Sequence, residues 1–206
     1  YEIYQCDWSS DVCSSDLFVE KWHYSQNING LRISYCFGLY DNENLIGVSI
    51  FGSPAMNNQA SKWNPDNPEK LLELRRLCCI DDTPKNTESY FIGQCLKYLK
   101  NNTDIEVIIS YADMTYNHEG IIYKATNFKH VGFTPGGRVI MYQGKRYHDK
   151  TIRTKYNGRL KPFAQRIKDA LETGEAYYTK TKGKHIYYYS LNDKKSKRKN
   201  RNTSKS

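Results

Sequence analysis

The sequence predicts an α/β fold in which helices flank a central mixed, mainly antiparallel sheet. Short runs rich in apolar, β-branched and aromatic residues predict the strands, and two segments with apolar residues at helical spacing predict the helices. Their order is strand–strand–strand–helix–strand–helix–strand, which is typical of α/β proteins. A chain of 206 residues is long enough for one domain with a substantial core and an appendage.

The first predicted elements are a β-hairpin and a third strand. The runs "RISYCFGLY" (32–40) and "LIGVSIFG" (45–52) are strand-like, and the "DNEN" between them has the composition of a turn. A polar loop rich in Asn and Pro follows. After it, "LLELRRLCCID" (71–81) predicts the third strand.

The first helix is predicted over "TESYFIGQCLKYLKNN" (87–102). Phe91, Cys95 and Leu99 are spaced four residues apart and so lie on one helical face. Asn86 or Thr87 can cap the helix start.

The next three segments complete this part of the chain. "IEVIISYAD" (105–113) is nearly all apolar, as expected of a strand buried on both faces. "HEGIIYKATNFKHVGF" (118–133) predicts a second helix that ends before Gly132, and "VIMYQGKRY" (139–147) predicts a final strand.

After residue 147 the composition becomes more basic. This segment predicts a helix over 162–171 and a strand over 185–191. The tail, 193–206, carries seven Lys or Arg residues against one Asp and is expected to be disordered. The expected organisation is a leader (1–17), a main domain (18–147), a basic C-terminal extension (148–192) and the tail.

The leader contains the string "CDWSSDVCSSDL" (6–17), whose composition matches nothing that follows. Its two cysteines and Ser-Ser-Asp units allow a disulfide loop or a metal clip. The string also resembles one reading frame of a widely used sequencing-library adapter, and this interpretation is favoured. We therefore rest no functional argument on residues 1–17, and the natural chain is expected to resume near Phe18.

The charge predicts a polyanionic partner. The leader holds four acidic residues and no Lys or Arg, so the rest of the chain has 31 basic against 18 acidic residues. Such a net charge fits nucleic acid, although solubility alone is the alternative. The remaining cysteines show no metal-ligand spacing, and no apolar run approaches 18 residues. A soluble protein of a reducing compartment, with no membrane contact, is expected.

Several polar groups fall at the ends of predicted elements, where ligands usually bind in α/β proteins. They lie in the segments "KWHYS" (21–25), "ELRRL" (73–77), "PKNTES" (84–89), "SYAD" (110–113) and "YNHEGIIY" (116–123). Each also has a structural interpretation. Asp113 can cap the next helix, Ser89 can hydrogen-bond at a helix start, and Arg75 can pair with Glu73.

The element order and the phrase "YKATNFKHVGFTPGG" resemble the acyltransferase fold of the GNAT superfamily. In that fold the strand before the first helix diverges from its neighbour, and the helix N-terminus faces the cofactor pyrophosphate. GNAT acetyltransferases usually carry a turn of the form Q/R-x-x-G-x-G/A there. This chain reads "DTPKNTES", without glycine, which puts a CoA-type donor in doubt.

The blocks "HYS", "NTES" and "YAD…HEGxxYxAxNF" together resemble the phage Mom family over roughly residues 18–191. The resemblance implies a GNAT-like enzyme that adds a carbamoylmethyl group to adenine N6 in double-stranded DNA and shields phage DNA from host restriction. Such an enzyme would act in the host-cell cytoplasm, and no protein partner is predicted. Carried over to this chain, the catalytic motifs fall on His23, Tyr24, Asp113, His118 and Tyr123, and the cofactor motifs on Arg75, Asn86 and Ser89.

The roles expected for these residues follow from the chemistry. His23 or Asp113 would accept a proton from N6, while Tyr24 and Tyr123 would orient or stack on the base. Arg75 and the helix start at Ser89 would hold an anionic donor. The donor itself is left open: it is either acetyl-CoA-like or a group handled by iron, for which His23, Tyr24 and Asp113 would be ligands.

Reaching N6 in a duplex requires the base to be flipped out. The predicted phosphate contacts are Lys150, Arg153, Lys155, Arg159, Lys161 and Arg166, whose alternative is a solvated helix face. Two rival functions remain. An ordinary GNAT N-acetyltransferase acting on an amine would bind acetyl-CoA tightly, and a non-catalytic DNA-binding protein would tolerate replacement of His23, Tyr24 and Asp113.

Overall fold

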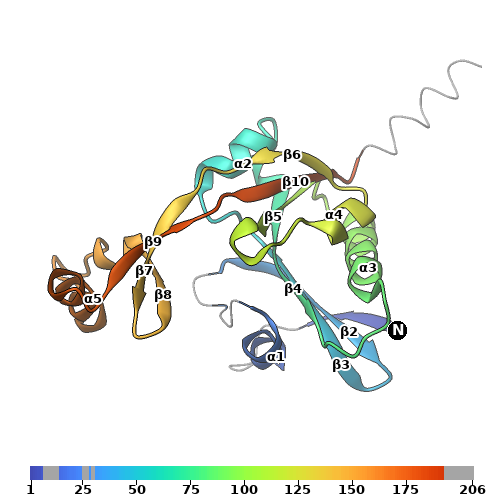
Figure 1. Ribbon diagram of the computed structural model, residues 1–206. Helices are drawn as coiled ribbons and strands as arrows, with labels where there is room; N and C mark the ends of the chain where they lie inside the picture. Colours follow the sequence, from blue (N-terminus) through green and yellow to red (C-terminus); the bar gives the residue numbers. More distant parts are fainter. Residues whose placement is uncertain (7–13, 25–27, 29–30, 193–206) are drawn as a thin grey trace, which may run out of the picture. The chain divides into compact units, whose positions relative to one another are not determined.

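The computed structural model describes residues 1–6, 14–24, 28 and 31–192 (Figure 1). Residues 7–13 of the leader, Ser25 and the basic tail lie outside the described residues, as do the expectations for them. The chain forms two compact units. The first comprises Tyr1–Ala112, Gly120–Gly132 and the chain from Ile186 onward, and the second comprises Asp113–Glu119 and Phe133–His185.

A seven-stranded mixed sheet dominates the first unit. Its strands, in spatial order, are β1 (Glu2–Gln5), β2 (Ile33–Asp41), β3 (Asn44–Gly52), β4 (Leu71–Cys79), β5 (Val107–Asp113), β10 (Lys184–Ser190) and β6 (Lys129–Phe133). The pairs from β1 to β4 are antiparallel, and β4 and β5 are parallel. This arrangement confirms the α/β fold with a mixed, mainly antiparallel sheet.

Helices cover both faces of this sheet. On one face, α3 (Thr87–Asn102) buries Phe91 and Leu99 in a core with Phe37 of β2. On the other, α1 (Ser14–Trp22) packs Val19 against Val48 of β3. Because successive side chains of a strand point to opposite faces of the sheet, neighbouring strand residues pack into different cores. Near β5, α2 (Asn57–Trp63) packs Ala60 and Trp63 on the second face, and η1 (Pro68–Lys70) leads into β4.

The two parallel strands separate partway along their length. Their paired residues run from Leu71 opposite Val107 to Leu74 opposite Ser110. Beyond Leu74, β4 continues to Cys79 beside β3 alone. The opening between β4 and β5 therefore begins at Leu74 and Ser110, as expected for the strand that precedes α3.

The second unit has its own small sheet and core. Its strands β7 (Gly137–Tyr142), β8 (Lys145–His148) and β9 (Tyr177–Thr181) are antiparallel, with β7 central. Helix α5 (Pro162–Thr173) packs against β7 through Ile167, Ala170 and Ile140. Two short 3-10 turns, η2 (Met114–Tyr116) and η3 (Asp149–Ile152), belong to this unit.

Two predicted elements are wrong. The second helix, α4 (Ile121–Ala125), has five residues, because Asn127 adopts a left-handed conformation (φ 64°) and ends it; residues 129–133 form β6 instead. The single strand predicted over 139–147 is a hairpin. Gln143 and Gly144 both have positive φ angles (49° and 72°), which is the geometry of a tight two-residue turn.

The expected boundary at residue 147 does not coincide with the units. The strand predicted over 185–191 is present as β10, but it returns to the seven-stranded sheet rather than to a separate extension. Among the described residues, no helix is long and apolar enough to cross a membrane.

Candidate functional site

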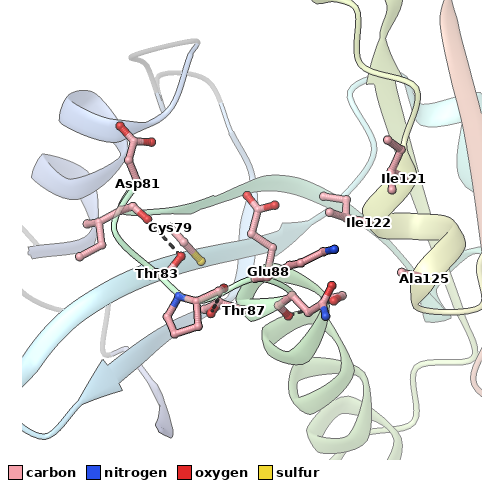
Figure 2. A pocket seen from close by; sticks show the side chains of 13 residues that line it. Cys79, Asp81, Thr83, Thr87, Glu88, Ile121, Ile122 and Ala125 are labelled. Atoms are coloured by element: carbon pink, nitrogen blue, oxygen red, sulfur yellow. Dashed lines mark hydrogen bonds between the residues drawn. The ribbon is translucent and has the colours of Figure 1, made fainter.

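A cavity of about 320 Å³ lies at the start of α3 in the first unit (Figure 2). It is lined by the end of β4, by the loop 80–86, by the first turn of α3 and by α4. We call it the α3-start cavity. Two of the three predicted cofactor residues, Asn86 and Ser89, line it.

The loop and the first turn of α3 hold each other in place. The Thr87 hydroxyl donates to the Pro84 carbonyl at 2.7 Å, and the Ser89 hydroxyl donates to the Asn86 carbonyl at 2.9 Å. Asn86 adopts a left-handed conformation (φ 73°), which turns the chain into the helix. The first N–H groups of a 16-residue helix therefore lie beside the cavity, where they favour an anion.

One carboxylate opposes this preference. Figure 2 shows the Glu88 side chain pointing from the start of α3 into the space between the loop and Ile122 of α4. Asp81 and Lys85 also line the cavity, and both are exposed. The helix start, Lys85, Asn86 and Ser89 fit the phosphate groups of an acetyl-CoA-like donor, and Glu88 weakens that fit.

Tyr123 of α4 is anchored at the point where β4 and β5 separate. Its hydroxyl shares a hydrogen bond with the Ser110 side chain. The Ser110 hydroxyl donates its proton to the Leu74 carbonyl at 3.1 Å, so it accepts from Tyr123. Tyr123 itself does not belong to the lining of the α3-start cavity, although its neighbours Ile121 and Ile122 do.

Burial raises the pKa of Tyr123 to about 12, and nearby Tyr24, Glu88 and Glu73 raise it further. Tyr123 is therefore protonated at neutral pH. It can orient a substrate but cannot act as a base.

His23 and Tyr24 follow α1. The His23 ring is buried and lies 4.3 Å from the exposed Tyr24 ring, centroid to centroid. Because Tyr24 acts on the pKa values of both Tyr123 and Arg76, these groups share one electrostatic neighbourhood. Tyr24 and Tyr123 thus lie within electrostatic range of each other in the first unit.

Arg75 forms the ion pair with Glu73 that is its structural interpretation in the sequence. Its Nε lies 3.4 Å from the Glu73 carboxylate, and its Nη1 donates to the Ser53 carbonyl at 2.8 Å. Arg75 does not belong to the lining of the α3-start cavity.

The two cysteines at the end of β4 are unreactive. Burial raises the pKa of both Cys78 and Cys79 to about 12, so neither thiol is a nucleophile at neutral pH.

Asp113 and His118 belong to the second unit. One Asp113 oxygen accepts the Thr115 N–H at 2.9 Å and caps η2, while the other lies 3.7 Å from the Lys184 ammonium. The His118 N–H donates to the Asp113 carbonyl at 3.3 Å, and its ring neighbours Tyr116. Asp113 is buried, and its bond to Thr115 gives it a structural role as the cap of η2.

In the part of the chain that the structure describes, no three His, Cys, Asp or Glu side chains gather as a metal site. The predicted ligand set for iron gains no support from these residues.

All six predicted phosphate contacts lie in the second unit and are exposed. Arg153 pairs with Asp149 at 2.8 Å, and the Lys161 ammonium lies 4.6 Å from the centre of the Tyr156 ring. Lys150 is on η3 and Arg166 is on α5, while Lys155 and Arg159 flank a tight turn.

The sequence interpretation missed Glu88 and Ser110. Both stand inside candidate segments, "NTES" and "SYAD". Glu88 was detectable as an acid in the first turn of a helix, whereas nothing in the sequence pairs Ser110 with Tyr123.

Known proteins share both the fold and the sequence pattern. A sequence model of the Mom protein family matches residues 11–206. The methylcarbamoylase Mom of Escherichia phage Mu is 27% identical over 137 residues, which are 65% of this chain and 56% of that protein. The chain thus spans little more than half of that relative.

Solved acetyltransferases have the same fold. An acetyltransferase from Bacillus subtilis in complex with CoA has a TM-score of 0.50 at 12% identity, covering 92% of this chain and 97% of its own. The ribosomal-protein-S18-alanine N-acetyltransferase of Escherichia coli also scores 0.50, at 8% identity, covering 92% and 93%. The expected GNAT-like fold is confirmed. Because the family match spans most of the sequence, this chain belongs to the Mom protein family.

Proposed function

We propose that this protein is a phage-type DNA-modification enzyme that adds a carbamoylmethyl group to adenine N6 in double-stranded DNA, protecting that DNA from host restriction. The family match over residues 11–206 carries the proposal. The name methylcarbamoylase, borne by the phage Mu relative, agrees with such a transfer. The enzyme would act in the host-cell cytoplasm.

The proposed chemistry assigns a task to each polar group. Adenine N6 is a poor nucleophile, because its lone pair is delocalised into the ring. In the reaction N6 bonds to the methylene carbon of the incoming group, the bond from that carbon to the donor's leaving group breaks with its electron pair, and N6 loses one proton. We assign the acceptance of that proton to Asp113 or His23. The Tyr123 oxygen, whose own proton is donated to Ser110, would accept a hydrogen bond from the amine, and Tyr24 would stack on the base.

The α3-start cavity is the proposed donor site. An acetyl-CoA-like donor would be held by the α3 N-terminus with Lys85, Asn86 and Ser89. When bound, such a donor would supply the carbamoylmethyl group only if it carried a leaving group on the methylene carbon, because the unsubstituted methyl group of acetyl-CoA has none. The Bacillus subtilis acetyltransferase of the same fold was solved with CoA, which supports this assignment. Arg75 stays a predicted donor contact, although Glu73 and Ser53 already engage it.

The exposed basic residues of the second unit are the proposed contacts to the DNA backbone. Phosphate contacts of this kind supply affinity without sequence preference, so they suit a protein that must hold a duplex while one base is extruded.

The test is nucleoside mass spectrometry of plasmid DNA from bacteria that express the chain after a start Met. We expect a deoxyadenosine heavier by one carbamoylmethyl group. Tyr123→Phe should lower its amount at least about tenfold, because one orienting hydrogen bond is lost. Tyr90→Phe, at an exposed tyrosine of α3, is the control and should leave the product unchanged. Unmodified deoxyadenosine from folded wild-type protein would contradict the proposal and favour an amine acetyltransferase or a passive DNA binder.

A further inference from the structure

A tight two-residue turn lies between η3 and α5 in the second unit. Asn157 and Gly158 have φ angles of 48° and 77°, and positive values at both central positions define the type I′ turn of a β-hairpin. The turn is closed by two backbone hydrogen bonds between Tyr156 and Arg159, of 2.7 and 3.0 Å. These two hydrogen bonds fix the backbone that carries the Tyr156 side chain.

The turn presents an aromatic ring to solvent. Tyr156 is 64% exposed, which places it among the most exposed aromatic side chains of the described residues. The Lys161 ammonium lies 4.6 Å from the centre of the ring, so a cation stands over it. Exposed aromatic area is costly in water unless a partner covers it.

Basic residues flank Tyr156 along the chain. From Lys150 to Lys168 the chain carries seven Lys or Arg residues and no Asp or Glu. Lys155 and Arg159 flank the turn directly, and both are exposed. A rigid aromatic tip set among cations matches a polyanion that also offers flat apolar surfaces, which is the chemistry of stacked bases between phosphates.

We propose that the Tyr156–Arg159 turn is a stacking wedge, in which the Tyr156 ring enters the base stack of double-stranded DNA while Lys155, Arg159 and Lys161 hold the flanking phosphates. The inference rests on the proposed function, since a flipped adenine leaves a gap that an inserted side chain fills. It assigns Tyr156 a positioning role, because it stabilises the open duplex and does not touch the reacting atoms.

The test measures binding to two short DNA duplexes that differ at one position. One is fully paired, and the other carries an abasic site, which provides the gap in advance. A 2-aminopurine beside that position reports stacking by its fluorescence quenching, and anisotropy gives the affinity. The full chain is used, with thermal unfolding to check that each variant is folded. Neither a donor nor a known target sequence is needed.

We expect the wild type to bind the abasic duplex at least about fivefold more tightly than the paired one, and to quench 2-aminopurine, because one stacked base is worth this much or more. Tyr156→Ala should lose the preference and the quenching. Tyr156→Phe should keep both, since the ring and not the hydroxyl stacks. Tyr177→Ala is the matched control, because Tyr177 is a similarly exposed tyrosine (59%) on β9 of the same unit.

Three outcomes would overturn the wedge: equal binding of both duplexes by the wild type, an equal loss in Tyr177→Ala, or an equal effect of Tyr156→Ala on single-stranded DNA. The failure of the wedge and the failure of the proposed function can be told apart. Modified adenine without abasic preference would refute the wedge alone, whereas abasic preference without modified adenine would refute the chemistry alone.

Discussion

Glu88 is the residue that most distinguishes this cavity from a simple anion site. Its carboxylate enters the cavity beside the start of α3, whose N–H groups favour phosphate. Replacing it by Gln removes one like charge from the neighbourhood of a bound diphosphate. We expect Glu88→Gln to tighten acetyl-CoA binding by roughly fivefold, corresponding to about 1 kcal/mol of relieved repulsion. Isothermal titration calorimetry measures this.

Asp81→Asn is the matched control for that experiment. Asp81 lines the same cavity but is exposed, so solvent screens its charge and the affinity should change by less than about twofold. Unchanged or weaker binding in Glu88→Gln would mean that the anionic part of the donor does not bind at the start of α3.

Asp113 combines a structural and a proposed chemical role, and two substitutions separate them. Asp113→Ala removes the cap of η2 and should cost about 1 kcal/mol of unfolding free energy. Asp113→Asn keeps an oxygen that can accept the Thr115 N–H. It loses only the 3.7 Å pair with half-exposed Lys184, which contributes little.

We expect Asp113→Asn to be as stable as the wild type within about 0.5 kcal/mol and to make at least about a hundredfold less modified adenine, because a proton acceptor is gone. Urea denaturation and nucleoside mass spectrometry provide the two values. Full activity in the Asn variant would reduce Asp113 to a cap and leave His23 as the base.

At the scale of elements, α4 begins at a glycine for two reasons. Gly120 has φ 66°, and a Cβ there would lie 2.6 Å from the Tyr187 hydroxyl and still closer to its ring. Gly120→Ala should therefore cost about 3 kcal/mol of unfolding free energy, from overpacking together with backbone strain. Because Tyr123 lies in α4, three residues after Gly120, the enzyme activity should fall as well.

Gly174, at the end of α5, isolates the backbone part of that cost. It has φ 85°, but a Cβ there would meet open space. Gly174→Ala should cost only about 1 kcal/mol. Equal destabilisation of the two variants in urea would show that the contact between Gly120 and Tyr187 is not tight.

The elements that could be predicted are those with strong local signals. The range 87–102 agrees with α3, because its apolar residues repeat at helical spacing, whereas the side chain of Asn86 makes no capping hydrogen bond. The second helix was overextended, because its apolar residues also suit β6, and nothing in the composition marks Asn127 as the residue that turns left-handed. The β7–β8 hairpin was missed because Gln143-Gly144 is a weaker turn signal than Asn-Gly.

At the scale of the molecule, the sequence could not show which distant residues meet. Ser110 on β5 and Tyr123 on α4 share a hydrogen bond only because the sheet opens between them, and Tyr24 reaches the same neighbourhood from the end of α1. Likewise, β10 returns to the seven-stranded sheet after the whole second unit has been formed. Such contacts depend on long-range packing, for which spacing along the chain gives no signal.

Protonated side chains buried in the first unit give the whole molecule an alkaline limit. Burial raises the pKa of Cys78 and Cys79, ordinarily near 9, to about 12, and does the same for Tyr111 and Tyr123, ordinarily near 10. Because the unfolded chain ionises first, the stabilisation from these neutral groups is complete below pH 9. It is lost as the pH rises from 9 through 12, and each group loses about 1.4 kcal/mol for every pH step of one between its unfolded and its folded pKa.

We therefore expect the unfolding free energy in urea to be the same at pH 7 and pH 8 and to fall by several kcal/mol by pH 11. Tyr111→Phe keeps the buried ring but removes one titrating hydroxyl, which bonds to Gln59 at 3.2 Å. This variant should start slightly less stable and lose less stability above pH 10. A constant unfolding free energy up to pH 11 would mean that these thiols and hydroxyls are open to water in the folded protein.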